Sequence, residues 1–269
     1  MKDTHVHTNI SHDGVSSAEE YLDIAKEKNV DEITFTEHYD IYDGIDTELK
    51  TSDVDKYEKK FSFIKDNTKV KTNFGIEIGL QPDIETYTKI RNMLRNYSFD
   101  YVIGATHIFR KIDISKNPSS FKNKTPQEIN EIYLNEVLKS LNLYYYEFDV
   151  VAHLDYIIRY TDKQRLNIKD YQDIIDTILK TLIRKDKGLE VNTSGIRYGL
   201  KDPHPNIDIV KRYKEFGGKI ITIGSDAHQA KDLASNFIEV CYMLESIGVD
   251  EVAIYHHRRP DFVKIKSLY

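Results

Sequence analysis

The sequence predicts an α/β fold in which buried parallel strands alternate with amphipathic helices. Short apolar runs rich in β-branched residues recur along the chain, and longer stretches with helical periodicity separate them about seven times. The chain has 269 residues, of which 40% are hydrophobic, and it contains no linker-like or repetitive tract. Because α/β barrels of about this size commonly form one domain, we expect a single domain over residues 1–269.

The elements alternate in order along the chain. The expected strands are the apolar runs at residues 4–7, 32–36, 74–78, 101–105, 149–152, 189–192, 219–223 and 251–254. The expected helices lie at approximately residues 17–28, 53–66, 83–95, 125–147, 168–187, 206–216 and 231–247. Serines at 16 and 17, followed by glutamates at 19 and 20, are typical of a capped helix start. The polar residues 108–124 predict a long loop of the kind that often binds ligands.

The composition argues against several classes of protein. A net charge of −6 counts against a nucleic-acid binder that relies on bulk positive charge. Cys241 is the only cysteine, so no internal disulfide can form, and residues 1–10 do not resemble a signal peptide. No apolar run approaches the roughly 20 residues that span a membrane. We therefore expect a cytoplasmic protein without membrane association, whereas the oligomeric state is not readable from the sequence.

Metal-binding residue types follow almost every expected strand. Six of the ten histidines lie at the carboxyl ends of these strands. In barrels and open α/β sheets, those ends form one face, where active sites lie. The residues concerned are Asp3, His5, His7, Glu37, His38, Glu77, His107, His153, Asp155, Asp226 and His228.

The residue types suit a cluster of divalent metal ions. Imidazole and carboxylate are the usual ligands of Zn, Mn and Fe ions. His5 and His7 are two residues apart in a strand and therefore point to the same side, while the two oxygens of Glu77 can bridge two ions. Two ions about 3.5–4 Å apart can activate water and neutralise a phosphoryl oxygen. A single His-x-His pair is a weak signal, so the prediction depends on the convergence of the whole set.

These residues occur in a series of motifs that resembles the polymerase-and-histidinol-phosphatase (PHP) superfamily. The motifs are Asp3-Thr4-His5-Val6-His7-Thr8, Ser11-x-Asp13-Gly14, Thr36-Glu37-His38, Gly75-Ile76-Glu77, Gly104-Ala105-Thr106-His107, Ala152-His153 and Gly224-Ser225-Asp226-Ala227-His228. Within the superfamily, residues 190–197 and 220–228 are most similar to monofunctional histidinol-phosphate phosphatases. The resemblance implies a single distorted (β/α)7 TIM-like barrel with a site for two or three divalent ions.

The resemblance also implies which residues hold each ion. The ligands would be His5, His7, Glu77 and Asp226 for the first ion, Glu77, His107 and His153 for the second, and Asp13, His38 and His228 for the third. Some relatives place a histidine where Asp13 stands, so His12 is an alternative ligand. The spacing from His7 favours Asp13.

The expected reaction is hydrolysis of L-histidinol phosphate by a hydroxide that bridges two metal ions. Arg159 and Arg197 follow expected strands, and their planar guanidinium groups suit phosphate oxygens. Ser194 is a candidate hydrogen-bond donor to the substrate. The leaving alkoxide must be protonated or stabilised by metal, and Asp226, His228 and a water on the third ion are the candidates, between which the sequence does not choose. His204, in Asp202-Pro203-His204-Pro205, is interpreted as a turn residue near the site.

Three other functions stay open at this point. The first is a related phosphoesterase that acts on nucleotides or short oligonucleotides. The second is an amidohydrolase-type hydrolase, although such barrels commonly use a carboxylated lysine where this chain has Glu77. The third is a metal-dependent or sugar-phosphate-binding scaffold without activity, which would have no need to keep nine ligands. Assays with histidinol phosphate, nucleoside monophosphates and single-stranded DNA test the first alternative, and metal content together with a phosphatase rate tests the third.

Overall fold

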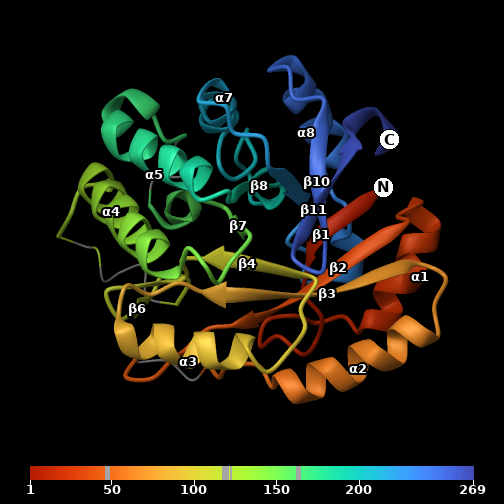
Figure 1. Cartoon of the computed structure of the whole chain (residues 1–269). Helices are drawn as coiled ribbons and strands as arrows, with labels where there is room; N and C mark the ends of the chain where they lie inside the picture. Colours follow the sequence, from red (N-terminus) through yellow and green to blue (C-terminus); the bar gives the residue numbers. More distant parts are fainter. Residues whose placement is uncertain (46–48, 117–120, 122, 162–164) are drawn as a thin grey trace.

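The computed structural model describes all residues except 46–48, 117–120, 122 and 162–164. Seven parallel strands form its main sheet, in the order β1-β2-β3-β4-β7-β8-β9. These strands are β1 (Lys2–Val6), β2 (Glu32–Tyr39), β3 (Lys71–Gly79), β4 (Tyr101–Ala105), β7 (Val150–Val151), β8 (Gly188–Asn192) and β9 (Ile221–Gly224). In Figure 1 the arrowheads of β3 and β4 point away from the N terminus, so the carboxyl ends of the strands face the opposite side of the molecule.

The sheet nearly closes into a barrel because the segment after β9 bonds to β1. The Asp226 amide donates to the His5 carbonyl at 2.9 Å, and the His7 amide donates to the Ala227 carbonyl at 2.9 Å. Inside the barrel, the hydroxyl groups of Tyr101 and Thr222 are 3.0 Å apart across it. The predicted α/β class and the distorted TIM-like barrel of seven strands are therefore confirmed.

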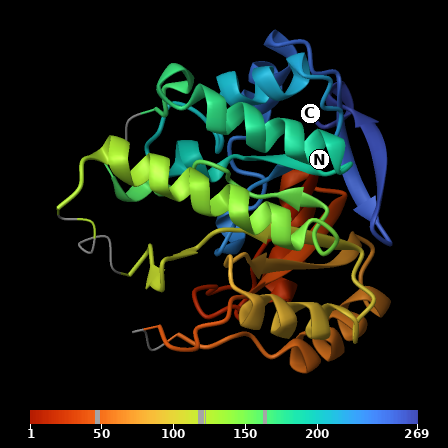
Figure 2. The same cartoon turned by 60° about the vertical axis from the view of Figure 1, so that its left-hand side comes forward.

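Helices surround the barrel close to their predicted positions. They are α1 (Ala18–Lys28), α2 (Val54–Asp66), α3 (Ile84–Leu94), α4 (Pro126–Tyr144), α5 (Gln172–Arg184), α6 (Ser194–Arg197), α7 (Ile207–Glu215) and α8 (Phe237–Ser246). The Ser17 side chain caps α1 in a reciprocal capping box with Glu20, as the sequence predicts. Helix α8 begins later than predicted, since residues 230–232 form a separate 3-10 turn. Figure 2 shows α4 and α5 lying side by side.

The prediction of a parallel strand at 251–254 is wrong. Strand β10 (Glu251–His256) pairs antiparallel with β11 (Arg259–Lys264) in a separate two-stranded sheet. The two residues between them, His257 and Arg258, have positive φ angles of 51° and 64°, as in a tight hairpin turn. Because β1 and β9 are already joined, the barrel leaves no edge for a further parallel strand. The buried side of β10 packs instead on Tyr101 and its neighbours.

The segment expected as a long loop contains a short hairpin. Strands β5 (Ile108–Phe109) and β6 (Ile112–Asp113) pair antiparallel directly after His107. Their residues are largely buried, so the start of the segment is not a simple polar loop, whereas residues 117–120 and 122 of the predicted loop lie outside the described residues. Across the described part of the chain, none of the helices combines the length and apolar character needed to cross a bilayer.

Candidate metal centre

The carboxyl ends of the strands bring the predicted ligands together at one cavity. This cavity has a volume of about 320 Å³. Its lining includes Asp13, His38, His107, His153, Asp226 and His228, and also the alternative ligand His12. His5, His7 and Glu77 lie beneath it and are completely buried. Side chains from residue 5 to residue 228 therefore converge on one face, as expected from the strand ends.

Glu77 occupies the centre of this cluster. Its carboxylate oxygens lie 2.8 Å from His38 Nδ1, 3.0 Å from His153 Nε2, and 3.5 Å from the Nε2 atoms of His5, His7 and His107. Burial alone would raise the pKa of Glu77, but the surrounding imidazoles hold it well below its usual range. An ionised carboxylate among five imidazoles is positioned to bridge more than one cation.

Asp226 completes a group with the two histidines of β1. The Nε2 atoms of His5 and His7 are 2.9 Å apart, so both rings point to one position. Asp226 Oδ1 lies 3.7 Å from the first of these atoms and 3.5 Å from the second. Together with Glu77, these residues are the set that the resemblance assigns to the first ion.

Asp13 lies closer than His12 to the remaining histidines. Its carboxylate oxygens are 3.5 Å from His38 Nε2 and 3.3 Å from His228 Nε2, and these two nitrogens are 3.4 Å apart. His12 Nε2 is 3.6 Å from Asp13 itself, and its ring stacks on His38 with a centroid distance of 5.4 Å. The geometry therefore favours Asp13 as the ligand and His12 as its neighbour.

The residues fit a cluster of divalent metal ions. His38 Nδ1 and Glu77 Oε2 are buried and face each other at 2.8 Å, but their contact lacks hydrogen-bond geometry, and neither atom has another hydrogen-bond partner among the described residues. Buried polar atoms are normally satisfied by a partner or by an ion. Three overlapping groups have ligand atoms within 4.8 Å of one another: His5, His7 and Glu77; His38, Glu77 and His107; and His7, His38 and His228. Imidazole and carboxylate donors at these separations are a suitable donor set for transition-metal ions.

Two carboxylates behind the cluster orient its histidines. Glu190 Oε1 lies 2.6 Å from His5 Nδ1, and Asp40 Oδ1 lies 3.2 Å from His107 Nδ1. Such contacts fix the tautomer and orientation of a metal-binding imidazole. Neither residue has a role that was predicted from the sequence. Glu190 could have been found by the argument applied to Glu77, because it is also a carboxylate inside an apolar strand.

Two acidic residues named in the sequence analysis hold loops rather than join the cluster. Glu37 accepts hydrogen bonds from the backbone amides and hydroxyl groups of Thr8 and Ser11. Asp3 accepts the amides of Ser225 and Ala234 at 2.9 Å. These bonds fix the loops that follow β1 and β9, which carry His7 and Asp226.

The backbone is strained at two candidate ligands. His153 has a φ of 22° and Asp226 a φ of 53°, in the left-handed region that non-glycine residues rarely adopt. Strain of this kind is typical of functional sites and persists where the surrounding structure fixes the conformation. Gly224 is needed beside them, because a Cβ atom there would lie 2.4 Å from His5 Cβ.

Arg159 lines the cavity and is held rigidly. Its guanidinium group packs between the rings of Tyr156 and Tyr198, at 4.9 and 4.3 Å from the ring centroids. Its Nη2 atom donates a hydrogen bond to Ser194 Oγ. Ser194 is fully buried and contacts two residues that line the cavity, Arg159 and Asp226, and the Oδ2 atom of Asp226 is 3.3 Å from its Oγ. The structure thus places a fixed positive charge beside the cluster.

Arg197 does not reach the cavity, contrary to the expectation that it contacts substrate. Its guanidinium group donates to the backbone carbonyls of Ser225 and Asp226 at 2.9 and 2.7 Å, and to Ser235 Oγ at 3.0 Å. Helix α6 carries Arg197, whose side chain contacts the loop after β9. In this position Arg197 supports the strained backbone of Asp226.

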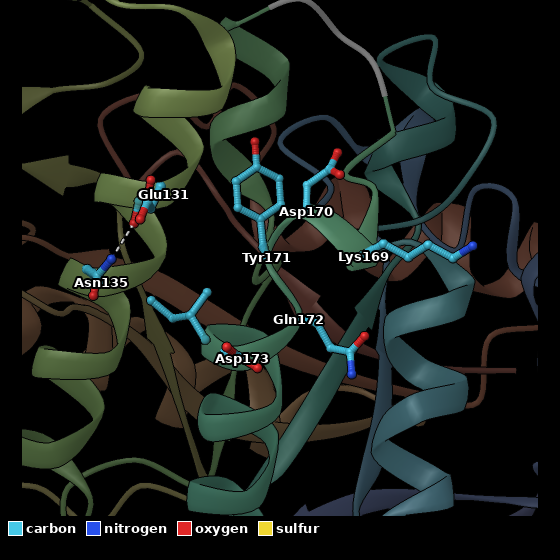
Figure 3. Close-up of a pocket in the computed structure, with 8 residues that line it drawn as sticks. Glu131, Asn135, Lys169, Asp170, Tyr171, Gln172 and Asp173 are labelled. Carbon is cyan, nitrogen blue, oxygen red and sulfur yellow. Dashed lines mark hydrogen bonds between the residues drawn. The ribbon is translucent and has the colours of Figure 1, made fainter.

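A second hollow lies between α4 and the start of α5 (Figure 3). Its polar lining includes Glu131 and Asn135 from α4, and residues 169–173. Among the described residues, its lining has no histidine and shares no residue with the cavity of the metal ligands. The candidate site is therefore the cavity at the strand ends.

Together, the fold and the site define a TIM-like barrel with a buried imidazole–carboxylate cluster at the carboxyl ends of its strands. Comparison with known proteins agrees with this class. The model of the PHP domain family matches residues 3–194. The chain therefore belongs to the PHP domain family.

Relatives cover nearly the whole chain. A Clostridium acetobutylicum protein named "Probable histidinol-phosphatase" is 34% identical, over 93% of this chain and 95% of its own length. A Lactococcus lactis protein named "Histidinol-phosphatase" is 28% identical, over 96% of each chain. A crystal structure of the L. lactis histidinol phosphate phosphatase, complexed with Zn, L-histidinol and phosphate, has a TM-score of 0.85, is 26% identical, and matches 97% of this chain and 98% of its own. A Listeria monocytogenes structure, 20% identical with a TM-score of 0.76, shares the fold over 90% of this chain and 100% of its own.

Proposed function

We propose that this protein is a phosphoric monoester hydrolase that converts L-histidinol phosphate to L-histidinol and phosphate. The observation that carries the proposal is that a buried imidazole–carboxylate cluster and a fixed arginine lie at the same cavity. The similar L. lactis enzyme, crystallised with Zn, L-histidinol and phosphate, supports the same substrate here. We further propose that residues 1–269 act as one domain, and that it works in the cytoplasm in histidine biosynthesis.

Two or three divalent ions, Zn, Mn or Fe, are proposed as cofactors. The ligand groups are His5, His7, Glu77 and Asp226; Glu77, His107 and His153; and Asp13, His38 and His228. When bound, such ions activate water as a nucleophile and neutralise charge on the phosphoryl oxygens. The chain supplies the orientation of the ligands, which Glu190 and Asp40 fix from behind.

Arg159 is proposed to bind the phosphoryl oxygens. It lines the cavity, and its Nη2 atom is 3.6 Å from Asp226 Oδ2, so it lies directly beside a proposed ligand. A guanidinium group presents several donors in a fixed plane and stays protonated at all relevant pH values. Stabilisation of charge on these oxygens is the main requirement of phosphoryl transfer. Arg197 is proposed to act indirectly, by holding the Asp226 backbone.

The organic part of the substrate carries an ammonium group and an imidazole, and the cavity offers partners for both. Asp113 Oδ1 accepts three hydrogen bonds from Ser115 and Lys116, whereas its Oδ2 has no partner among the described residues. We assign the ammonium group to this buried carboxylate. Tyr42 and Tyr160 also line the cavity and offer ring surfaces for the imidazole.

Asp226 and His228 are proposed to assist the departure of the alkoxide. His228 Nδ1 lies 3.6 Å from Asp226 Oδ1, and both residues line the cavity. Burial would lower the pKa of His228, but Asp13 and Asp226 raise it above its ordinary value. Because His228 is also a proposed ligand of the third ion, it would assist by holding that ion close to the leaving oxygen.

Turnover by metal-replete protein tests the proposal. L-histidinol phosphate is compared with p-nitrophenyl phosphate, nucleoside monophosphates and single-stranded DNA. We expect histidinol phosphate to have the highest kcat/KM. Asp113→Asn should reduce kcat/KM for histidinol phosphate at least about tenfold, because it removes the charge opposite the ammonium group, while p-nitrophenyl phosphate turnover should change little. Preferential cleavage of nucleotides or DNA would instead favour the nucleotide phosphoesterase.

A further inference from the structure

His204 makes a buried contact with Arg159 that the catalytic chemistry does not require. Its Nε2 atom accepts a hydrogen bond from Arg159 Nε at 2.9 Å. On the other side of the ring, His204 Nδ1 lies 2.5 Å from Asp155 Oδ1. Both His204 and Asp155 are completely buried. The three side chains form a line that ends at the cavity.

The chemistry of the line fixes the proton on His204. A guanidinium group has only donors, so His204 Nε2 must accept the hydrogen bond. The ring proton therefore resides on Nδ1 and is donated to the Asp155 carboxylate. Burial lowers the pKa of His204 below its ordinary value, and Arg159 adds to this effect, whereas Asp155 opposes it. The neutral ring thus has one tautomer that satisfies both neighbours.

The line joins three parts of the fold. Arg159 belongs to a 3-10 helix (Tyr156–Tyr160) after β7, and the other Asp155 oxygen accepts the Asn206 amide at 3.1 Å. The backbone of His204 pairs with Asn192 at the end of β8, with N–O distances of 2.7 and 2.8 Å. Because the main chain of His204 is held by its own bonds, the imidazole is a fixed reference point for Arg159.

Two nitrogens of the Arg159 guanidinium group are therefore held by protein acceptors, while the third is free to bind an anion. Its Nε atom is bonded to His204, and its Nη2 atom to Ser194. Among the described residues, Nη1 has no hydrogen-bond partner, although Arg159 lines the cavity. The remaining donors of the guanidinium group are those available to an anion.

We propose that His204 is a positioning residue that aims Arg159 at the phosphoryl group of the substrate. The inference rests on the proposed function only for the identity of the substrate. An arginine that is already oriented loses little conformational freedom when it binds an anion, so the anion binds more tightly. Removal of the acceptor at His204 should weaken phosphate binding more than it slows the chemical step.

Two substitutions separate the two contacts of the ring. His204→Asn keeps a donor near Asp155 but loses the acceptor for Arg159, whereas His204→Gln extends an oxygen toward Arg159. We expect His204→Asn to raise both KM for histidinol phosphate and Kd for inorganic phosphate about tenfold, with kcat changed less than about threefold. His204→Gln should restore both to within about threefold of the wild type. His257→Asn, on the exposed β10–β11 turn, is the matched control and should change neither.

Whether the effect of His204→Asn depends on Arg159 shows whether His204 positions Arg159 or only supports the fold. In an Arg159→Lys background there is no Nε donor for His204, so His204→Asn should have no further effect on phosphate binding. The same tenfold loss in both backgrounds would overturn the proposal, and so would an unchanged phosphate Kd in the single variant. Metal content and Tm are measured for every protein.

A replacement variant and a binding assay that does not depend on turnover complete the experiment. If His204→Asn does not fold, Asp155→Asn takes its place, with the expectation that phosphate binding weakens only when Arg159 is present. Phosphate binding to metal-loaded protein is measured by calorimetry, so it does not depend on the organic part of the substrate. Failure to hydrolyse histidinol phosphate would refute the proposed function, while the coupling would still be decided by phosphate binding.

Discussion

Glu190→Gln tests whether the carboxylate behind His5 tunes the metal cluster. Glu190 Oε1 faces His5 Nδ1, while Oε2 accepts hydrogen bonds from the His153 amide and from Asn192 Nδ2, both at 3.1 Å. All three neighbours are donors when His5 binds metal through Nε2. A glutamine of the same shape must turn its NH₂ group either toward the His153 amide and Asn192 Nδ2, which are both donors, or toward His5 Nδ1. In the second case, His5 has to give up the tautomer that leaves Nε2 free for an ion.

The magnitude follows from these contacts. If the NH₂ group faces the two donors, loss of two hydrogen bonds to a buried charged acceptor, at about 1.5 kcal/mol each, should lower the free energy of unfolding of metal-free protein by about 3 kcal/mol. In either orientation the charged acceptor that faces His5 is lost, so metal affinity should fall about 10- to 100-fold. Urea denaturation of metal-free protein and metal titration against a competing chelator measure the two effects.

A matched control separates metal binding from general destabilisation. Glu32 is also a buried carboxylate, but it begins β2 at the opposite end of the barrel and pairs with Lys2 and Asn73. Glu32→Gln should therefore lower stability without changing metal affinity. If Glu190→Gln retained the metal affinity of the wild type, or if Glu32→Gln weakened metal binding equally, the reasoning about His5 would be wrong.

Three other perturbations test the cluster itself. Glu77→Gln should lower the bound metal content and reduce kcat/KM at least about a hundredfold, as measured by atomic absorption and turnover; full activity would exclude a bridging role. Asp13→Ala should lower the metal content whereas His12→Ala should not, and the reverse result would make His12 the ligand. Metal affinity should rise with pH. Burial lowers the pKa of His107, but Asp40 and Glu77 have a larger, opposite effect and raise this pKa to about 10. Below that pH the metal-free protein holds a proton that an ion must displace. For each proton displaced, the Kd for metal should therefore fall by up to about tenfold per pH unit as the pH rises. Chelator-competition titrations at several pH values measure this Kd, and a constant value would contradict the expectation.

Local sequence patterns predict the elements of this fold, whereas contacts between distant residues decide how some of them pair. Hydrophobic runs, capping residues and the order of elements predicted the α/β alternation and its helices, because these patterns depend on periodicity within short segments. The closed barrel was implied only by the resemblance to the PHP superfamily. The pairing of β10 escaped prediction, since an apolar run looks the same in a parallel strand and in a hairpin. Its turn, His257-Arg258, carries none of the usual glycine or asparagine signals.

The sequence by itself determined which residue types stand at the strand ends, and hence that imidazoles and carboxylates such as Glu77 would gather on one face. Only the tertiary structure decided their partners. It placed Glu190 behind His5, directed Arg197 to a backbone loop instead of the cavity, and set His204 against Arg159. The physical reason is that a strand end fixes the face on which a side chain lies. Its contacts, by contrast, depend on barrel closure and on loops that join residues more than 30 positions apart.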